Sequence, residues 1–240
     1  MQTTGNLDDY YALDIETSGP SLDRDLVLQI GWARVVGGRV VSVESELLDW
    51  SSYLGTASEA YAALRQSLDK LDAQLADKGE TLYTTLDRLE QEGLPPLDAL
   101  GRCLDRLLEL AFRNVTVAGY NAFRFDSPFL RAAFCRWLDF SPSPFEDNSL
   151  LDVGAMFLAM RTGTAPMPCE TLREFHHRVL ERHVSGVTWS LKTAAAWAGL
   201  PPFALHDAGD DARVCALVLE HFRQEGLKEG LHCPGFRLEQ

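Results

Sequence analysis

The sequence predicts a mixed α/β domain in which helices pack against a central sheet. Two observations favour this class. The first fifty residues have the composition of a β-meander, and the second half of the chain alternates helical segments with single short apolar runs. Between these parts, from about residue 56 to residue 92, apolar side chains recur at helical spacing. This order indicates a sheet core flanked by helices, with an inserted helical element.

The β-meander is predicted from three apolar runs near the N-terminus. Residues 10–16 and 26–36 are rich in strand-forming side chains, and residues 39–48 alternate between apolar and polar positions. The pair Gly37-Gly38 between the last two runs is typical of a tight hairpin. We therefore expect three consecutive strands joined by short turns.

The inserted element is predicted to be helical because apolar residues recur at three- and four-residue steps. The residues in this pattern are Tyr61, Leu64, Leu68, Leu71 and Leu75. A shorter helix is expected at residues 82–89. We interpret residues 51–78 as a plain helical connection rather than as an element that selects the substrate.

The second half of the chain is predicted to alternate strands and helices. Pro95-Pro96 begins a helix with one apolar face, and residues 114–119 form a short strand. The further expected elements are a helix at 127–138, a strand followed by a helix within 150–160, and helices at 169–182, 190–199 and 208–224.

The chain is predicted to form a single domain over residues 1–240, with its core at about 8–225 and the helical insertion at about 51–92. No apolar run reaches the roughly 18 residues that a membrane span needs. The N-terminal segment lacks the basic and apolar parts of a secretory signal. We therefore expect a soluble, cytoplasmic protein with no membrane partner.

The five cysteines are widely spaced and form no CxxC pair, so neither a disulfide framework nor a cysteine zinc site is indicated. Most of them have apolar neighbours and are expected to be small core residues in a reducing compartment. They are Cys103, Cys135, Cys169, Cys215 and Cys233.

Asp14 and Glu16 are the first candidate site residues. Residues two apart in a strand project to the same face, so the two carboxylates lie side by side, while Leu13 and Ile15 point to the opposite face. Like charges on one face are unfavourable without a cation, and Mg²⁺ prefers oxygen ligands of this kind. Such a pair also arises by chance among 35 acidic residues, so it does not decide the function alone.

Asp126 is the second candidate. It stands where a strand and a loop give way to a helix, and the positive end of the helix favours a carboxylate there. The alternative is that Asp126 only caps this helix.

His206 and Asp211 form the third candidate group. On a continuous helix they would point about 140° apart. They converge if His206 lies in the loop before the helix. Pro201-Pro202 keeps that loop irregular, and Asp207 is expected to cap the helix. A neutral imidazole near a bound water is suited to act as a general base. The alternative is a capped helix with a surface histidine.

Together these segments provide the groups that phosphodiester hydrolysis requires. That reaction needs an activated water and neutralisation of charge on the phosphate and on the leaving oxygen. Four carboxylates carry four negative charges, which two divalent ions balance. The predicted metal ligands are Asp14, Glu16, Asp126 and Asp211, with His206 as the base and two ions, Mg²⁺ or Mn²⁺, as cofactors.

The three motifs resemble those of the DEDDh (DnaQ-like) 3′→5′ exonuclease family, which has an RNase H-like fold. DIET at 14–17, NAFRFD at 121–126 and HDAGDDA at 206–212 match its first, second and third motifs in order. The second motif is one residue longer than in many members. The likeness covers about residues 8–225, apart from 51–78.

The resemblance implies a role for each residue. Asp14, Glu16 and Asp211 would bind the ion that holds the nucleophilic water. Asp14 would bridge to a second ion, near which Asp126 acts. His206 would be the general base, and the products would be nucleoside 5′-monophosphates.

The implied partner is the 3′ end of a nucleic acid, single-stranded DNA or RNA. A net charge of −13 argues against a protein that coats long nucleic acid. Two divalent ions would add four charges and leave −9, so we expect short contacts at a strand end, or a protein partner or homodimer that adds affinity.

Other functions remain open at this point. The chain could be a proofreading exonuclease subunit of a polymerase, an inactive nuclease-like module that binds nucleic acid or protein, or an acidic structural protein. Metal-dependent degradation of a labelled strand that Asp14→Ala abolishes separates an active enzyme from the inactive module.

Several further polar residues are assigned no chemistry. Asp152 is expected to be structural. Arg124 is interpreted as solvated surface rather than as a phosphate contact. His176, His177 and His183 are interpreted as a solvated helix face rather than as a transition-metal site, because no acid or cysteine completes a ligand set.

Overall fold

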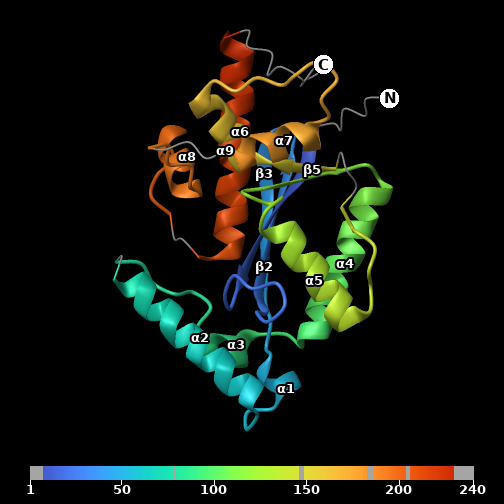
Figure 1. Cartoon of the computed structure of the whole chain (residues 1–240), viewed down its shortest axis with the longest axis vertical. Coiled ribbons are helices and arrows are strands. Elements are labelled where there is room, and N and C mark those ends of the chain that lie inside the picture. Colours follow the sequence, from blue (N-terminus) through green and yellow to red (C-terminus); the bar gives the residue numbers. More distant parts are fainter. Residues whose placement is uncertain (1–7, 78, 146–148, 183–185, 204–205, 230–240) are drawn as a thin grey trace.

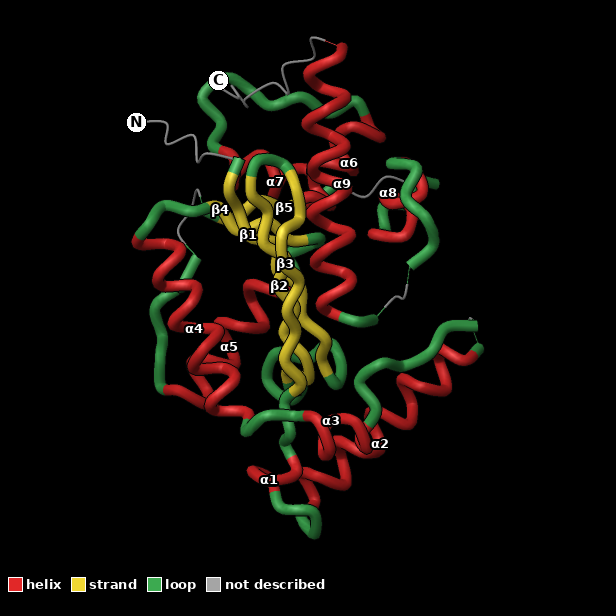
Figure 2. Tube along the Cα trace, turned by 180° about the vertical axis from the view of Figure 1, so that it is seen from behind, coloured by secondary structure: helices red, strands yellow, loops and turns green. Residues whose placement is uncertain are grey.

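The computed structural model of the chain describes residues 8–77, 79–145, 149–182, 186–203 and 206–229. Over these residues a five-stranded sheet forms the centre of the molecule, in the order β3-β2-β1-β4-β5. Helices cover both faces of the sheet (Figures 1 and 2). The predicted mixed α/β class is confirmed.

The β-meander forms as predicted, with bounds that differ by at most one residue. β1 (Asp9–Thr17) pairs antiparallel with β2 (Val27–Val36), which pairs antiparallel with β3 (Arg39–Leu47). Gly37 and Gly38 have φ values of 57° and 71°. A two-residue hairpin turn needs this left-handed backbone, which only glycine adopts without strain.

The two remaining strands lie on the other side of β1 and run parallel to it. β4 (Thr116–Gly119) pairs with β1 only as far as Ala12, which lies opposite Ala118, and β5 (Leu150–Asp152) pairs with β4. The chain leaves the sheet after Gly119. The second half of β1 therefore presents an edge on which its backbone groups need other partners.

One face of the sheet is covered by the long helix α9 (Ala208–Glu229), with α8 (Leu191–Trp197) and α6 (Val153–Thr162) beside it. Figures 1 and 2 show α9 running lengthwise beside the sheet and ending before the part of the sheet nearest the insertion. Tyr10 and Ala12 of β1 are buried in the core on this face. Because side chains alternate along a strand, the even-numbered residues of β1 face α9.

The opposite face is covered by α4 (Pro96–Phe112) and α5 (Asp126–Leu138). Leu13 and Ile15 of β1 are buried in the larger core on this side. Pro96 starts α4, as predicted from the Pro-Pro pair, because proline fits the first turn of a helix.

The insertion forms a separate layer beyond one end of the sheet (Figures 1 and 2). It contains α1 (Ser51–Leu54), α2 (Glu59–Ala76) and α3 (Leu86–Glu92). The short α1 was not predicted, and the second expected helix begins later than residue 82 because the Thr85 side chain caps it by accepting the Arg88 N–H. The predicted apolar face of α2 joins the larger core through Tyr61, Leu64, Leu68 and Leu75.

The helix expected at 169–182 is α7 (Leu172–Glu181), which packs on α6 and β5. Its start is set by a capping box in which the Thr171 side chain and Glu174 satisfy each other's backbone N–H groups. Cys169 has a φ of 65°, so the helix cannot extend back to it.

Two of the predicted core cysteines, Cys103 and Cys215, are buried. Cys135 and Cys169 are exposed, which corrects that interpretation for them, and Cys233 lies outside the described residues. Within the described part of the chain, no helix combines the length and the apolar character that a membrane crossing requires.

Candidate active site

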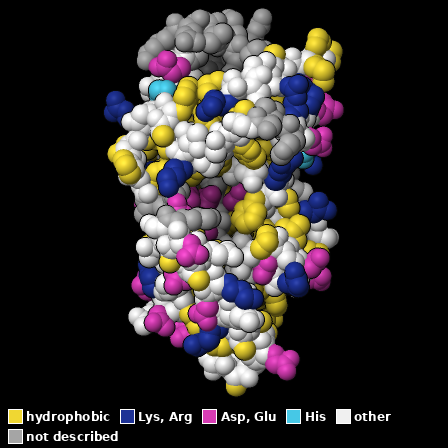
Figure 3. All heavy atoms as spheres, turned by 60° about the vertical axis from the view of Figure 1, so that its left-hand side comes forward, with side chains coloured by type: hydrophobic (Ala, Val, Ile, Leu, Met, Phe, Trp, Pro, Cys, Tyr) yellow, Lys and Arg dark blue, Asp and Glu magenta, His cyan; other side chains and the backbone are white. Residues whose placement is uncertain are grey.

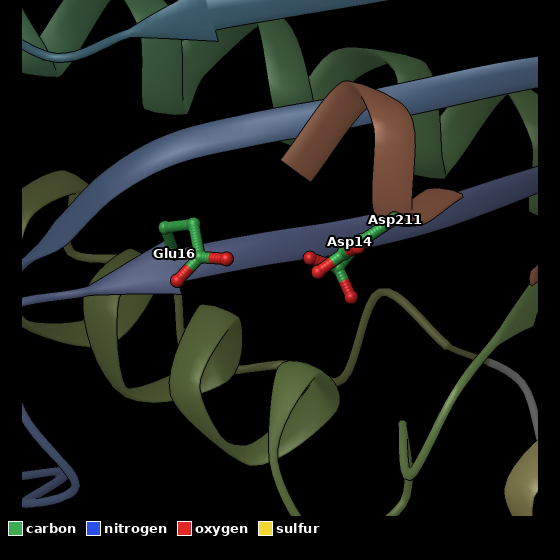
Figure 4. A group of neighbouring side chains, drawn as sticks. All are labelled: Asp14, Glu16 and Asp211. Atoms are coloured by element: carbon green, nitrogen blue, oxygen red, sulfur yellow. The ribbon is translucent and has the colours of Figure 1, made fainter. Parts of the chain in front are cut away.

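Asp14 and Glu16 lie on the part of β1 that extends past β4. Both side chains point to the face that α9 covers, as their even-numbered positions require. In Figure 4 they rise from the same strand, and Asp211 approaches them from the first turn of α9. The strand pattern therefore placed the first two carboxylates correctly.

A glycine allows α9 to come this close. Gly31 of β2 lies directly opposite Asp14, and a Cβ atom on it would lie 2.0 Å from the Ala208 carbonyl oxygen and 2.4 Å from the Gly209 nitrogen. Any other residue would collide with the backbone of α9. The first turn of the helix thus rests on the strand, and Asp211 is carried to the carboxylates of β1.

A buried glutamine fixes the same end of α9. Gln29 of β2 accepts a hydrogen bond from the Ala208 N–H at 3.1 Å and donates one to Asp207 Oδ1 at 3.1 Å. Asp207 also accepts the Gly209 N–H at 3.0 Å, in agreement with its predicted capping role. Sequence reasoning missed Gln29. Its only signal was one amide inside the apolar run VLQIGW.

The three acidic residues form a compact oxygen-rich group. One carboxylate oxygen from each of Asp14, Glu16 and Asp211 lies within 4.8 Å of the other two. Asp211 Oδ1 is buried and has no hydrogen-bond partner among the described residues. In Figure 3, acidic side chains gather in a hollow in the middle of one face. A buried oxygen without a donor, beside two more carboxylates, fits a divalent cation that prefers oxygen ligands.

Asp126 is attached to the same strand by a different contact. It is the first residue of α5, is 2% exposed, and its Oδ1 accepts the Ile15 N–H at 3.0 Å. That N–H belongs to the edge of β1 that β4 leaves free. The alternative of a simple cap is wrong, because Phe125 is the capping residue and no side-chain bond caps this helix.

The pKa values of the four site carboxylates are raised in the absence of a cation. Burial, followed by the charge of neighbouring carboxylates, raises the pKa of Glu16 to about 8. Burial raises the pKa of Asp126 and of Asp211 to about 7, although backbone N–H groups oppose the shift in both. The pKa of Asp14 is also raised, by burial and then by Asp126. Four acids packed this closely require protons or cations to balance them.

His206 stands in the loop before α9, as predicted, and its backbone is unusual. Its φ is 64°, a left-handed conformation that is uncommon for a residue other than glycine, and its N–H donates to Asp211 Oδ2 at 3.4 Å. The ring nitrogen Nδ1 lies 3.8 Å from Glu16 Oε1. The structure therefore brings the imidazole to the acidic group.

The second ring nitrogen of His206 faces a residue that sequence reasoning missed. Nε2 lies 3.5 Å from Glu80 Oε2, and Glu80 Oε1 accepts a hydrogen bond from Lys192 Nζ at 3.1 Å. Glu80 belongs to the insertion, between α2 and α3. No local motif marks it, because its partners lie more than a hundred residues away in the chain.

Asp152 has the structural role that we expected. It caps α6 by accepting the Ala155 N–H at 2.9 Å, and it also accepts the N–H groups of Asn121 and Phe123 at 3.1 and 3.0 Å. It thereby holds the loop of the second motif, in which Asn121 has a φ of 63°. Burial raises the pKa of Asp152 to about 6 against the effect of these donors.

The histidine interpretation needs a correction. His176 is fully buried rather than solvated, because α7 turns it onto β5, where its Nδ1 accepts the Asp152 N–H at 3.3 Å. Burial lowers its pKa to about 3. His177 is half-buried with its ring 5.1 Å from that of Phe123, and His183 lies outside the described residues. Arg124 is exposed, as expected.

No family model matches the chain, and no curated protein is similar to it in sequence. Solved structures are similar in fold. The zinc-bound form of an Escherichia coli exonuclease I complex with single-stranded DNA has a TM-score of 0.61 and 17% identity, over 92% of this chain and 42% of that one. Exonuclease I from Methylocaldum szegediense has a TM-score of 0.61 and 20% identity, over 92% and 41%. E. coli exonuclease I with a dT13 oligonucleotide has a TM-score of 0.61 and 16% identity, over 93% and 42%.

The structural similarity agrees with the resemblance that the three motifs carry. It confirms the RNase H-like fold at low sequence identity and over most of this chain. The chain spans about two fifths of the length of these exonucleases.

Proposed function

We propose that the chain is a metal-dependent 3′→5′ exonuclease that releases nucleoside 5′-monophosphates from single-stranded DNA or RNA. The observation that carries this proposal is the group of carboxylate oxygens from Asp14, Glu16 and Asp211, within 4.8 Å of one another. Asp126 and His206 border the same group. The five predicted residues thus meet on an RNase H-like fold.

The donor set fits two divalent ions, Mg²⁺ or Mn²⁺. Asp14, Glu16 and Asp211 would hold one ion, and Asp14 with Asp126 the other. When bound, such ions neutralise the charge that builds on the phosphate and on the leaving 3′-oxygen. The unpartnered Asp211 Oδ1 supports this assignment, because a buried carboxylate oxygen without a donor is unfavourable unless a cation contacts it.

The residues of the chain perform the remaining work. His206 is proposed to take a proton from the attacking water, since its ring lies beside Glu16 and is 34% exposed, so that water reaches it. The bond from the Ile15 N–H to Asp126 and the bond from the His206 N–H to Asp211 keep these carboxylates oriented. The reacting groups are therefore positioned before substrate arrives.

The substrate class is proposed from the solved relatives. Exonuclease I structures similar to this chain contain single-stranded DNA, and the hollow in Figure 3 is open on one face. The whole chain, residues 1–240, is proposed to be one exonuclease domain, with its core at about 8–225 and the insertion at about 51–92. Contacts restricted to a strand end also agree with a net charge of −13.

One experiment tests the proposal. A 5′-labelled single strand, as DNA and as RNA, is incubated with the protein in Mg²⁺, Mn²⁺ or EDTA, and products are resolved by length. We expect stepwise shortening from the 3′ end that EDTA abolishes, that a 3′-phosphate blocks and that Asp14→Asn removes. The matched control is Asp69→Asn, which neutralises an exposed carboxylate of α2 and should retain wild-type activity.

The outcomes separate the remaining alternatives. Strand binding without cleavage in any metal would make the chain a nuclease-like binding module. Cleavage that continues in EDTA, or that starts at the 5′ end, would contradict the proposed mechanism.

A further inference from the structure

The insertion reaches the candidate active site through one side chain. Glu80 lies between α2 and α3, and Figures 1 and 2 show α2 extending from the end of the sheet toward the connection between α8 and α9. There Glu80 Oε2 lies 3.5 Å from His206 Nε2. The insertion, of which we interpreted residues 51–78 as a plain connection, therefore contacts the proposed base through a residue just beyond that stretch.

We propose that Glu80 is a positioning residue that orients the imidazole of His206 for proton transfer. This inference rests on the proposed function and adds a residue to the same site. Glu80 would accept the Nε2–H, so that the lone pair of Nδ1 faces Glu16 and the reacting centre. Glu80 itself touches neither substrate nor ion.

The orientation of the ring supports this role. Its two nitrogens face opposite partners, with Nδ1 3.8 Å from Glu16 Oε1 and Nε2 3.5 Å from Glu80 Oε2. In a neutral imidazole one nitrogen donates and the other accepts, and the partner of the donor decides which is which. An acid on the far side of a histidine base fixes its tautomer in catalytic triads. Hydrogen bonds at such sites often shorten only when substrate is bound.

Glu80 is held in place as a carboxylate. Lys192 on α8 donates to its other oxygen at 3.1 Å, and this bond, with a contribution from His206, lowers the pKa of Glu80 below its ordinary value. The Glu80 side chain is 19% exposed, whereas that of Lys192 is 67% exposed. The carboxylate thus stays charged beside the ring, and the ammonium group offsets the repulsion it would exert on an incoming phosphate.

The surroundings of Glu80 make it suitable for substitution. Residues 79–81 line a cavity of about 500 Å³ together with α8 and residues 200–203. Because Glu80 borders this cavity, its truncation should leave the fold intact. Asp77 at the end of α2 is an exposed acid of the same insertion and provides a matched control.

The first measurement compares kcat and KM for Glu80→Ala, Glu80→Gln and Asp77→Ala on a short single strand. We expect Glu80→Ala to lower kcat by about tenfold to a hundredfold with little change in KM, as for other partners that orient a functional histidine. Glu80→Gln should recover most of the rate, because its amide oxygen still accepts the Nε2–H. Asp77→Ala should match the wild type.

The second measurement follows the ring directly and needs no turnover. Nitrogen-15 histidine labelling of the metal-free protein, with His206→Ala to identify the signal, reports which ring nitrogen carries the proton. We expect the Nε2–H form in the wild type and in Glu80→Gln, and a mixture of both forms in Glu80→Ala. Thermal melts check that each variant is folded.

The outcomes distinguish this inference from the proposed function. An active wild type with unchanged kcat and tautomer in Glu80→Ala would overturn the positioning role and leave the exonuclease proposal standing. A higher kcat or a lower KM in Glu80→Ala would show that Glu80 only restrains the site or repels substrate, which also overturns the inference. A wild type without nuclease activity but with the expected tautomers would contradict the proposed function alone.

Discussion

Gly31 offers the sharpest test of how the fold assembles the site. It lies on β2 opposite Asp14, and the backbone of α9 rests directly on it. A Cβ atom at this position would lie 2.0 Å from the Ala208 carbonyl oxygen, whereas ordinary contact begins at 3.4 Å. The obstacle is helix backbone, so a side-chain rotation does not relieve it.

The size of the effect of Gly31→Ala follows from this geometry. The first turn of α9 must move by about 1.4 Å to clear the new methyl group. Overpacking of this kind costs about 1–3 kcal/mol of stability. Asp211 lies in the same turn, and a displacement of about 1 Å in a reacting group lowers a rate by about a hundredfold. We expect a folded protein with a lower melting temperature and a kcat reduced by about that factor.

The assay combines kcat on a labelled single strand, Mg²⁺ affinity by calorimetry and thermal melting. The control is Gly101→Ala in α4, where a Cβ atom meets nothing within 4 Å and helix propensity should raise stability by up to about 1 kcal/mol. If Gly31→Ala keeps wild-type kcat and Mg²⁺ affinity, the close approach of α9 does not position Asp211, and this account of the site is refuted.

Three further results are expected. Burial raises the pKa of Glu16 to about 8 and of Asp126 and Asp211 to about 7, so the folded metal-free protein keeps protons that the unfolded chain releases near pH 4. Its melting temperature in EDTA should therefore fall as the pH rises from about 5 to 8. Mg²⁺ should restore the melting temperature at pH 8. A melting temperature of the metal-free protein that is highest at pH 8 would contradict this expectation. Gln29→Leu removes both hydrogen bonds to the start of α9 and should lower the free energy of unfolding in urea by about 1–3 kcal/mol; equal stability would exclude a clamping role. His206→Ala should lower kcat by about 10²–10⁴ with an unchanged circular dichroism spectrum, and wild-type turnover would exclude it as the base.

Local periodicity was enough to predict most of the fold. Strand-forming composition predicted β1 and β2, and alternation predicted β3. Helical spacing predicted α2 and α4, because it marks the face of a helix that neighbouring elements bury. Errors occurred at boundaries, where single side chains decide. Thr85 and Thr171 start their helices later than the apolar pattern indicated.

The site was predictable where its geometry is local and not elsewhere. Asp14 and Glu16 share a face because they are two residues apart in one strand, and the loop position of His206 followed from the five-residue spacing to Asp211. Gln29 and Glu80 escaped notice because their partners are distant in the chain and no spacing rule connects them.

His176 was misjudged for a related reason. A helix with several histidines and charges looks solvated when considered alone, but α7 packs on α6 and β5, which places His176 in the core. Its neighbour His177 remains half-buried. Which face of a polar helix is covered depends on its packing partners, and these are set by the fold as a whole.

Three locally unfavourable features meet at this site and argue against an acidic structural protein. Like charges lie close together in a partly buried group, formed by Asp14, Glu16 and Asp211. His206 has a left-handed backbone conformation. Position 31 must be glycine, because the backbone of α9 packs directly against the strand there. Each feature reduces stability, and such features concentrate where a protein performs chemistry. Under the proposed function, a divalent ion would relieve the first, and the other two would keep the proposed ligands and the proposed base in their relative positions. Surface acids that only solvate a protein would need none of the three.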